Sequence, residues 1–136
     1  TSGKELLTIN FLGWKICPFI CYDLRFPVWA RNTCDYDLLI YTANWPQKRI
    51  HAWDTLLRAR AIENMAYWVG VNRTGKDDNL NQYNGHSAIY DVLGKQLTTT
   101  KYEGNFYETI ILEKTHIVSE RAHFQFLSDR DHFTLN

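Results

Sequence analysis

Three short, almost wholly apolar runs constrain the fold more than any other feature of this sequence. They cover Trp14 to Cys21, Asp37 to Thr42 and Ala66 to Asn72, and each has the length and composition of a buried strand. Before the third run, apolar residues recur at intervals of three and four from Ile50 to Met65, which is the pattern of one helical face. Parallel strands joined by helices produce this order, so the sequence predicts an α/β fold.

Further elements are predicted around these runs. A helix running through Trp29 and Ala30 is predicted after the first run, because Pro27 suits a first helical turn. The last part of the chain is expected to close the sheet as a meander. The remaining elements are a strand at Glu5 to Phe11, a polar loop at Thr74 to Gly85, strands at Ser87 to Tyr90, Leu97 to Tyr102 and Phe106 to Leu112, and a helix at Lys114 to His123.

The composition predicts one soluble domain. The chain has 136 residues, and Lys plus Arg and Asp plus Glu each number 15, so no overall field attracts nucleic acid. Its apolar runs are far shorter than a membrane span. The three cysteines form no paired C-x-x-C, which predicts a reducing compartment and no structural zinc. We therefore expect a cytoplasmic protein with no metal or other cofactor and with neither a nucleic-acid nor a membrane partner.

Cys21 is the residue whose position most suggests chemistry. It lies at the carboxyl end of a predicted buried strand, where open α/β sheets usually bind ligands. A helix that starts there would favour the nucleophilic thiolate. Position alone favours a buried structural thiol, because free cysteine is among the most buried residue types, and this is the interpretation we give to Cys17 and Cys34.

The sequence around Cys21 strongly resembles the nucleophile motif of the nitrilase superfamily of carbon-nitrogen hydrolases. The matching residues run from Ile20 to Pro27 and read I-C-Y-D-L-R-F-P. Within the superfamily, the segments R-F-P-V-W, A-N-W-P and R-A-I-E-N look most like the omega-amidase branch, which hydrolyses the terminal amide of 2-oxoglutaramate and related 2-oxo acid amides. The resemblance continues through Asp37 to Trp45, Arg58 to Asn64, Gly85 to Ser87 and Phe126 to Asp131.

The resemblance implies that residues 1–136 form a single carbon-nitrogen hydrolase domain that lacks its N-terminal half. The complete domain of the family is a four-layer α-β-β-α sandwich built from two similar halves. The implied fold is therefore α/β, the C-terminal half of such a sandwich, with a mixed sheet. The family's glutamate base and its oxyanion-stabilising lysine belong far upstream of the cysteine, and only 20 residues precede Cys21. We therefore expect this chain to be inactive on its own.

The resemblance also implies roles for individual residues. Cys21 matches the nucleophile, which attacks an amide carbonyl, releases ammonia and leaves a thioester that water hydrolyses. The backbone N–H of Tyr22 would be one oxyanion donor, and the planar fork of Arg25 would receive a substrate carboxylate. Asn44 and Trp45 follow the next strand, so parallel pairing would bring them to the sheet edge of Cys21, where they would contact substrate.

These candidate residues also have structural alternatives. Arg25 is consistent with an ion pair to Asp23 or to another buried acid, and Trp45 with an ordinary hydrophobic lid. Glu63 lies in a segment that resembles a structural and dimer-interface helix of the family, so we do not assign it as the base. None of the five histidines has a recognisable partner motif.

Two classes of function stay open. The first is a hydrolase of a small-molecule amide, an omega-amidase or another amidase, carbamoylase or nitrilase, that assembles as a homodimer or higher homo-oligomer through the helix at Ile50 to Met65. The second is a non-catalytic fragment or pseudoenzyme that acts as a binding or assembly module.

Overall fold

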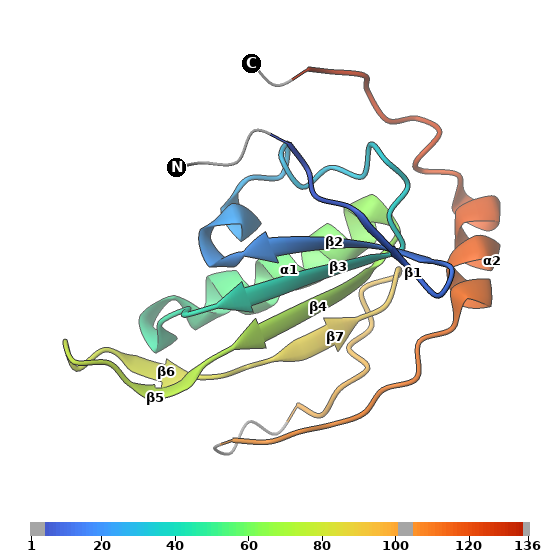
Figure 1. The fold of residues 1–136 in the computed structure, drawn as a ribbon. Coiled ribbons are helices and arrows are strands. Elements are labelled where there is room, and N and C mark those ends of the chain that lie inside the picture. Colours follow the sequence, from blue (N-terminus) through green and yellow to red (C-terminus); the bar gives the residue numbers. More distant parts are fainter. Residues whose placement is uncertain (1–4, 101–104, 135–136) are drawn as a thin grey trace.

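A five-stranded mixed sheet forms the centre of the computed structural model, which describes residues 5–100 and 105–134 (Figure 1). The strand order is β1-β2-β3-β4-β7. The three central strands are parallel, whereas each edge strand is antiparallel to its neighbour. The α/β class and the mixed sheet are therefore confirmed. The strands are β1 (Ile9–Phe11), β2 (Trp14–Ile20), β3 (Leu38–Ala43), β4 (Tyr67–Asn72) and β7 (Ala88–Tyr90).

Helix α1 (Ile50–Asn64) covers one face of the sheet, behind the strands in the view of Figure 1. Alternate strand residues, such as Leu39 and Trp68, are fully buried in the core cluster that α1 completes. The helix packs so closely that Gly70 has no room for a side chain. A Cβ there would lie 2.5 Å from Cδ1 of Leu57, so only glycine allows this approach.

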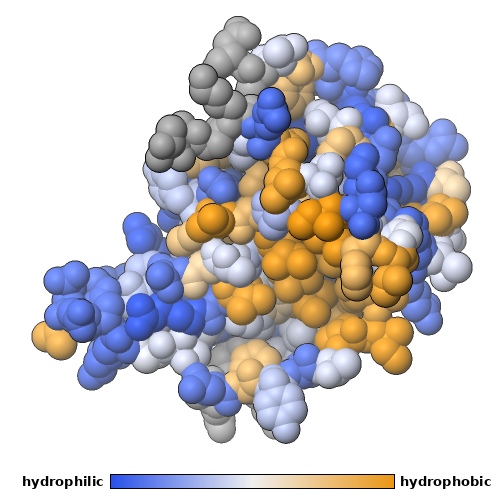
Figure 2. All heavy atoms as spheres, in the orientation of Figure 1, coloured by the Kyte–Doolittle hydropathy of each residue, from blue (hydrophilic) through white to orange (hydrophobic). Residues whose placement is uncertain are grey.

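The opposite face of the sheet carries a second set of apolar side chains. The strand register aligns Pro18, Ile40, Val69 and Ile89 in one row across four strands, and all four are half-buried. Ile20, at the end of β2, is 70% exposed. Figure 2 shows hydrophobic side chains gathered over the face of the molecule turned away from α1. The apolar runs predict strands buried on both faces, but within the described residues no helical layer covers the middle of this second face.

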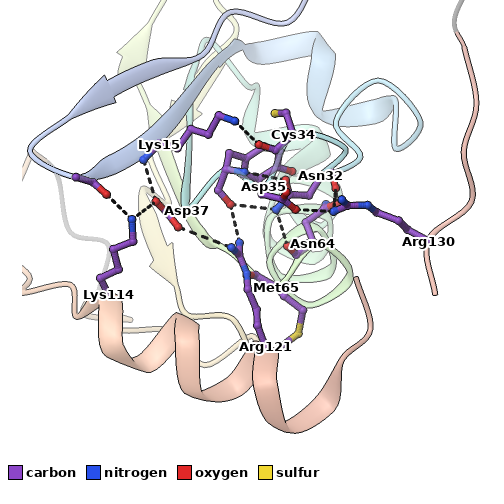
Figure 3. A network of polar contacts seen from close by, with 12 residues as sticks. Lys15, Asn32, Cys34, Asp35, Asp37, Asn64, Met65, Lys114, Arg121 and Arg130 are labelled. Atoms are coloured by element: carbon purple, nitrogen blue, oxygen red, sulfur yellow. Dashed lines mark hydrogen bonds and ion pairs between the residues drawn. The ribbon is translucent and has the colours of Figure 1, made fainter. Parts of the chain in front are cut away.

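Helix α2 (Lys114–Phe124) packs at the end of the sheet where the parallel strands begin (Figure 1). Its Ile117 is buried against Tyr67 of β4. The buried carboxylate of Asp37 anchors the helix: Oδ2 lies 2.9 Å from Nζ of Lys114, and Oδ1 lies 3.7 Å from Nη1 of Arg121 (Figure 3). Polar contacts therefore fix α2 to the residue that precedes β3.

Two elements lie at the other end of the sheet, where the parallel strands finish. Strands β5 (Thr74–Lys76) and β6 (Gln82–Asn84) form a hairpin that projects beyond the carboxyl ends of the strands (Figure 1). A short 3-10 helix, η2 (Gln47–Arg49), precedes α1. The sequence predicts a polar loop at Thr74 to Gly85, so the hairpin is a correction. Its turn is stabilised by Asp77, which accepts the backbone N–H groups of Asn79 and Asn81.

Other predictions also need correction. The predicted helix that runs through Trp29 and Ala30 is wrong, because a 3-10 helix η1 (Cys21–Arg25) ends before Pro27. The strands predicted at Leu97 to Tyr102 and Phe106 to Leu112 are also wrong, because their described residues form no strand; an isolated bridge joins Gln96, just before the first of them, to Tyr90. Both Leu97 and Leu112 pack against the cluster around Ile117, and the backbone N–H of Leu97 also donates to the carbonyl oxygen of Ile89 in β7 at 2.8 Å. Residues 101 and 102 lie outside the described part.

The central strands and both long helices are confirmed, with bounds within about two residues of those predicted. Within the residues that the structure describes, no helix has both the length and the apolar character to cross a membrane.

Candidate active site

Cys21 lies at the sharp turn that joins β2 to η1. Its backbone has a φ of +39°, in the left-handed region that residues with a side chain seldom adopt. Such strained positions cluster at functional sites, because the surrounding structure must hold them in place. The side chain is half-buried and is not part of a disulfide.

Contacts from both sides hold this turn. The carboxylate of Asp23 accepts the backbone N–H of Ile20 at 3.0 Å, which closes the turn around Cys21. On the α1 side, Nη2 of Arg60 donates to the carbonyl oxygen of Leu24 at 3.2 Å. Leu24 itself is fully buried. The turn therefore depends on the core beneath it and not on a long helix. The helix predicted to start at Cys21 is thus a 3-10 helix of only five residues.

A cavity of about 460 Å³ opens beside Cys21 at the carboxyl ends of β2, β3 and β4. Register explains why these three ends meet, since Ile20 aligns with Thr42 and Thr42 with Val71. Cavities of this volume hold small molecules. The described lining residues are Ile20, Cys21, Thr42, Ala43, Asn44, Val71, Asn72 and Arg73.

The structure brings Asn44 to the same cavity as Cys21, as the parallel pairing predicts. Trp45 takes a different position. It is buried beneath the loop, where its indole N–H donates to the carbonyl oxygen of Arg49 at 2.8 Å and its ring packs against Trp53. Trp45 therefore supports the cavity from the core and does not belong to its lining.

Arg25 lies on Trp45, with its guanidinium carbon 4.7 Å from the ring centroid. It too lies outside the cavity lining, and among the described residues it forms no ion pair with Asp23 or with any other carboxylate. Tyr22 is 65% exposed, and its ring packs edge-on against Phe26.

Two lining residues, Asn72 and Arg73, are not among the sequence candidates. Asn72 is buried, and its side-chain amide bonds to the backbone of Trp45 and of Gly85. The rule that brings Asn44 to the sheet edge also applies to the end of the run Ala66 to Asn72, so the signal was present in the sequence. None of the segments that carry the family resemblance includes Asn72 or Arg73.

Other reactive side chains lie away from the cavity lining. Glu63 forms an ion pair with Arg60 at 3.0 Å, and Nδ1 of His86 lies 3.0 Å from the carboxylate of Asp54. Cys17 is fully buried, and burial raises the pKa of its thiol to about 11, with a smaller effect from Cys34. No group of three or more His, Cys, Asp or Glu side chains in the described residues is placed to hold a metal ion.

Comparison with known proteins shows the family to which this chain is related. The carbon-nitrogen hydrolase family model matches residues 2–115. The chain belongs to the carbon-nitrogen hydrolase family. It is 57% identical over 94 residues to the omega-amidase YafV of Yersinia enterocolitica, which covers 69% of this chain and 37% of that protein. It is 41% identical over 113 residues to the 2-oxoglutaramate amidase of Bacillus subtilis, which covers 82% of this chain and 42% of that protein.

The structural comparison agrees with this membership of the carbon-nitrogen hydrolase family. The fold matches all of this chain to XC1258 from Xanthomonas campestris, a CN-hydrolase superfamily protein with an arsenic adduct in its active site, with a TM-score of 0.94 and 41% identity. The match covers 54% of that protein. The nitrilase-like fold is therefore confirmed, and the chain spans between about a third and about half of the length of these relatives.

Proposed function

We propose that this chain carries the nucleophile of an omega-amidase, which hydrolyses the terminal amide of a 2-oxo acid amide such as 2-oxoglutaramate. The observation that carries the proposal is the half-buried Cys21, held at φ +39° beside a cavity of about 460 Å³ where three parallel strands end. Similarity to an omega-amidase and to a 2-oxoglutaramate amidase supports the substrate class.

The proposed reaction proceeds in two steps. The Cys21 sulfur forms a bond to the amide carbon, and the carbonyl electrons move to oxygen, where the backbone N–H of Tyr22 donates to the developing charge. The C–N bond breaks, the leaving nitrogen takes up the proton given up by the thiol and departs as ammonia, and a thioester remains. Water then adds to the thioester carbon and the C–S bond breaks, which gives a carboxylate and restores the thiol.

The proton transfers need groups outside the described cavity lining, which contains no Glu, Asp, His or Lys. We infer that the glutamate and the lysine implied by the family resemblance come from another part of the protein. The limited share of each relative that this chain covers supports this inference. Alone, the chain would then bind the substrate weakly and would not turn it over.

Two further properties belong to the same proposal. We infer a homodimer in which α1 contributes to the interface, and the 42% exposure of the apolar Ile62 on that helix supports it. We also infer a cytoplasmic location, which the three free cysteines support.

Turnover by the full-length protein tests the substrate class. Ammonia release is measured with 2-oxoglutaramate, with glutamine and with an aliphatic nitrile. The proposal predicts the highest kcat/KM for 2-oxoglutaramate. A higher value for the nitrile or for glutamine would assign the protein to another branch. No turnover of any amide, together with no labelling of Cys21 by iodoacetamide beyond the rate of an ordinary thiol, would favour a non-catalytic binding or assembly module.

A further inference from the structure

Arg73 is the charged side chain in the described lining of the Cys21 cavity. It follows β4, whereas Cys21 follows β2, and β3 lies between these two strands. The backbones at the two positions are therefore about two strand spacings apart, roughly 10 Å. A small molecule inside the cavity can reach the thiol with one end and the guanidinium with the other.

The guanidinium of Arg73 is held in place but is not neutralised. Its central carbon lies 4.6 Å from the ring centroid of Tyr83, and Nη2 donates to the carbonyl oxygen of Lys76 at 3.1 Å. No described carboxylate lies within ion-pair distance, in contrast to Arg60, Arg121 and Arg130. Since a guanidinium has five N–H donors in a planar fork, these contacts leave most of the fork for a ligand.

The ring of Tyr83, on which the Arg73 guanidinium lies, is itself held in place. The hydroxyl of Tyr83 donates to Oδ2 of Asp77 at 2.9 Å, and the same oxygen accepts the side-chain amide of Asn81 at 2.9 Å. These bonds tie the two strands of the β5–β6 hairpin together at its turn. The hairpin therefore presents an aromatic face that orients the guanidinium at the cavity.

We propose that Arg73 receives the free carboxylate of the substrate while Cys21 attacks the amide at its other end. The inference rests on the proposed amidase function and deepens it, because it assigns the residue that holds the free carboxylate of the substrate. Arg73 would then be a specificity-determining residue. Arg25, which the sequence favours for this role, lies on the buried Trp45 and outside the cavity lining.

A pair of matched substrates tests this role in the full-length protein. Succinamate carries the carboxylate, and butanamide replaces it with a methyl group. Arg73→Gln is expected to lower kcat/KM for succinamate about 30-fold, the effect of losing a hydrogen-bonded charge partner, with butanamide changed less than about twofold. Arg73→Lys is expected to recover part of the loss. Arg58→Gln is the control, because Arg58 also lies over an aromatic ring, that of Tyr90, but lines no part of this cavity.

A second readout does not depend on turnover. Glutarate is expected to slow iodoacetamide labelling of Cys21 in the wild type and in Arg58→Gln, but to lose at least about tenfold in protective potency in Arg73→Gln. Equal losses for both substrates, unchanged protection, or a selective loss in Arg25→Gln in place of Arg73→Gln would overturn the role of Arg73. If the wild type is protected by glutarate yet hydrolyses no amide, the proposed function fails while the carboxylate site stands.

Discussion

The side-chain amide of Asn72 closes a ring of two hydrogen bonds with the backbone of Trp45. The backbone N–H of Trp45 donates to Oδ1 of Asn72 at 2.7 Å, and Nδ2 of Asn72 donates to the carbonyl oxygen of Trp45 at 3.0 Å. Nδ2 also donates to the carbonyl oxygen of Gly85 at 2.7 Å. One buried amide thus joins the end of β4 to the loop that carries Asn44 and to the segment after the hairpin.

Substitution of Asn72 should therefore destabilise the protein and disturb the cavity. Asn72→Ala leaves buried backbone groups of Trp45 and Gly85 without partners, which costs about 2–3 kcal/mol. Urea denaturation of the full-length protein measures the free energy of unfolding. The control is Asn79→Ala, at an exposed position in the hairpin turn, which should change it by less than about 0.5 kcal/mol. Similar values for both variants would contradict the role of Asn72.

The contact between Gly70 and α1 makes a second prediction. In Gly70→Ala the new methyl group would lie 2.5 Å from Cδ1 of Leu57 and 2.7 Å from Cζ2 of Trp53. Overpacking of this kind costs about 1–3 kcal/mol. Adding Leu57→Ala should restore part of the loss caused by Gly70→Ala, so a double-mutant cycle is expected to give a favourable coupling energy. Additive effects of the two substitutions would show that the helix does not approach the sheet so closely.

The anchor of α2 provides a third test. Asp37→Asn removes the negative charge that pairs with both Lys114 and Arg121, at a side chain that is only 7% exposed. The free energy of unfolding is expected to fall by about 1–3 kcal/mol. Faster amide hydrogen exchange in α2 should accompany it. Glu120→Gln, which removes the charge from a 3.8 Å contact with the half-buried His116 on the same helix, is the control and should have little effect. Unchanged exchange in Asp37→Asn would contradict the anchor.

The Cys17 thiol makes a prediction about pH. Its pKa is raised from 9.0 to about 11, chiefly by burial, so between these values the unfolded chain loses a proton that the folded chain keeps. The free energy of unfolding should therefore be unaffected by this group below about pH 9 and should fall as the pH rises toward 11. Cys17→Ala should reduce that slope, and Cys34→Ala should largely keep it. An identical slope in wild type and Cys17→Ala would refute the assignment.

The central part of the fold could be predicted because its physical signals are local. The apolar runs at Trp14 to Cys21 and Asp37 to Thr42 have strand length, and the helix at Ile50 to Met65 shows its period directly. The strand predicted to begin at Leu97 does not form over its described residues: one backbone hydrogen bond joins Leu97 to Ile89 of β7, while the Leu97 side chain packs into the cluster that contains Ile117 of α2. A high content of apolar residues indicates that a segment is buried, but it does not show whether the segment is a paired β-strand or an irregular segment.

Only some of the residues at the candidate site can be predicted from the sequence, for a similar reason. Cys21 and Asn44 follow strands, so parallel pairing places both at one sheet edge. The positions of Trp45 and Arg25 depend on which side chain turns into the core, which no motif spacing specifies. The position of the Arg73 guanidinium depends on its contact with the ring of Tyr83, ten residues further along the chain. The two residues are brought together by a hairpin, and the polar composition of its turn predicts a loop instead.

The covalent step at Cys21 is the central claim, and trapping it is the most direct test. The full-length protein is mixed with 2-oxoglutaramate, quenched with acid within the first turnovers, digested and analysed by peptide mass spectrometry. We expect an acyl adduct on the peptide that contains Cys21, absent from Cys21→Ala and retained in Cys34→Ala. An adduct on another residue, or ammonia release that persists in Cys21→Ala, would contradict the assignment of Cys21 as the nucleophile.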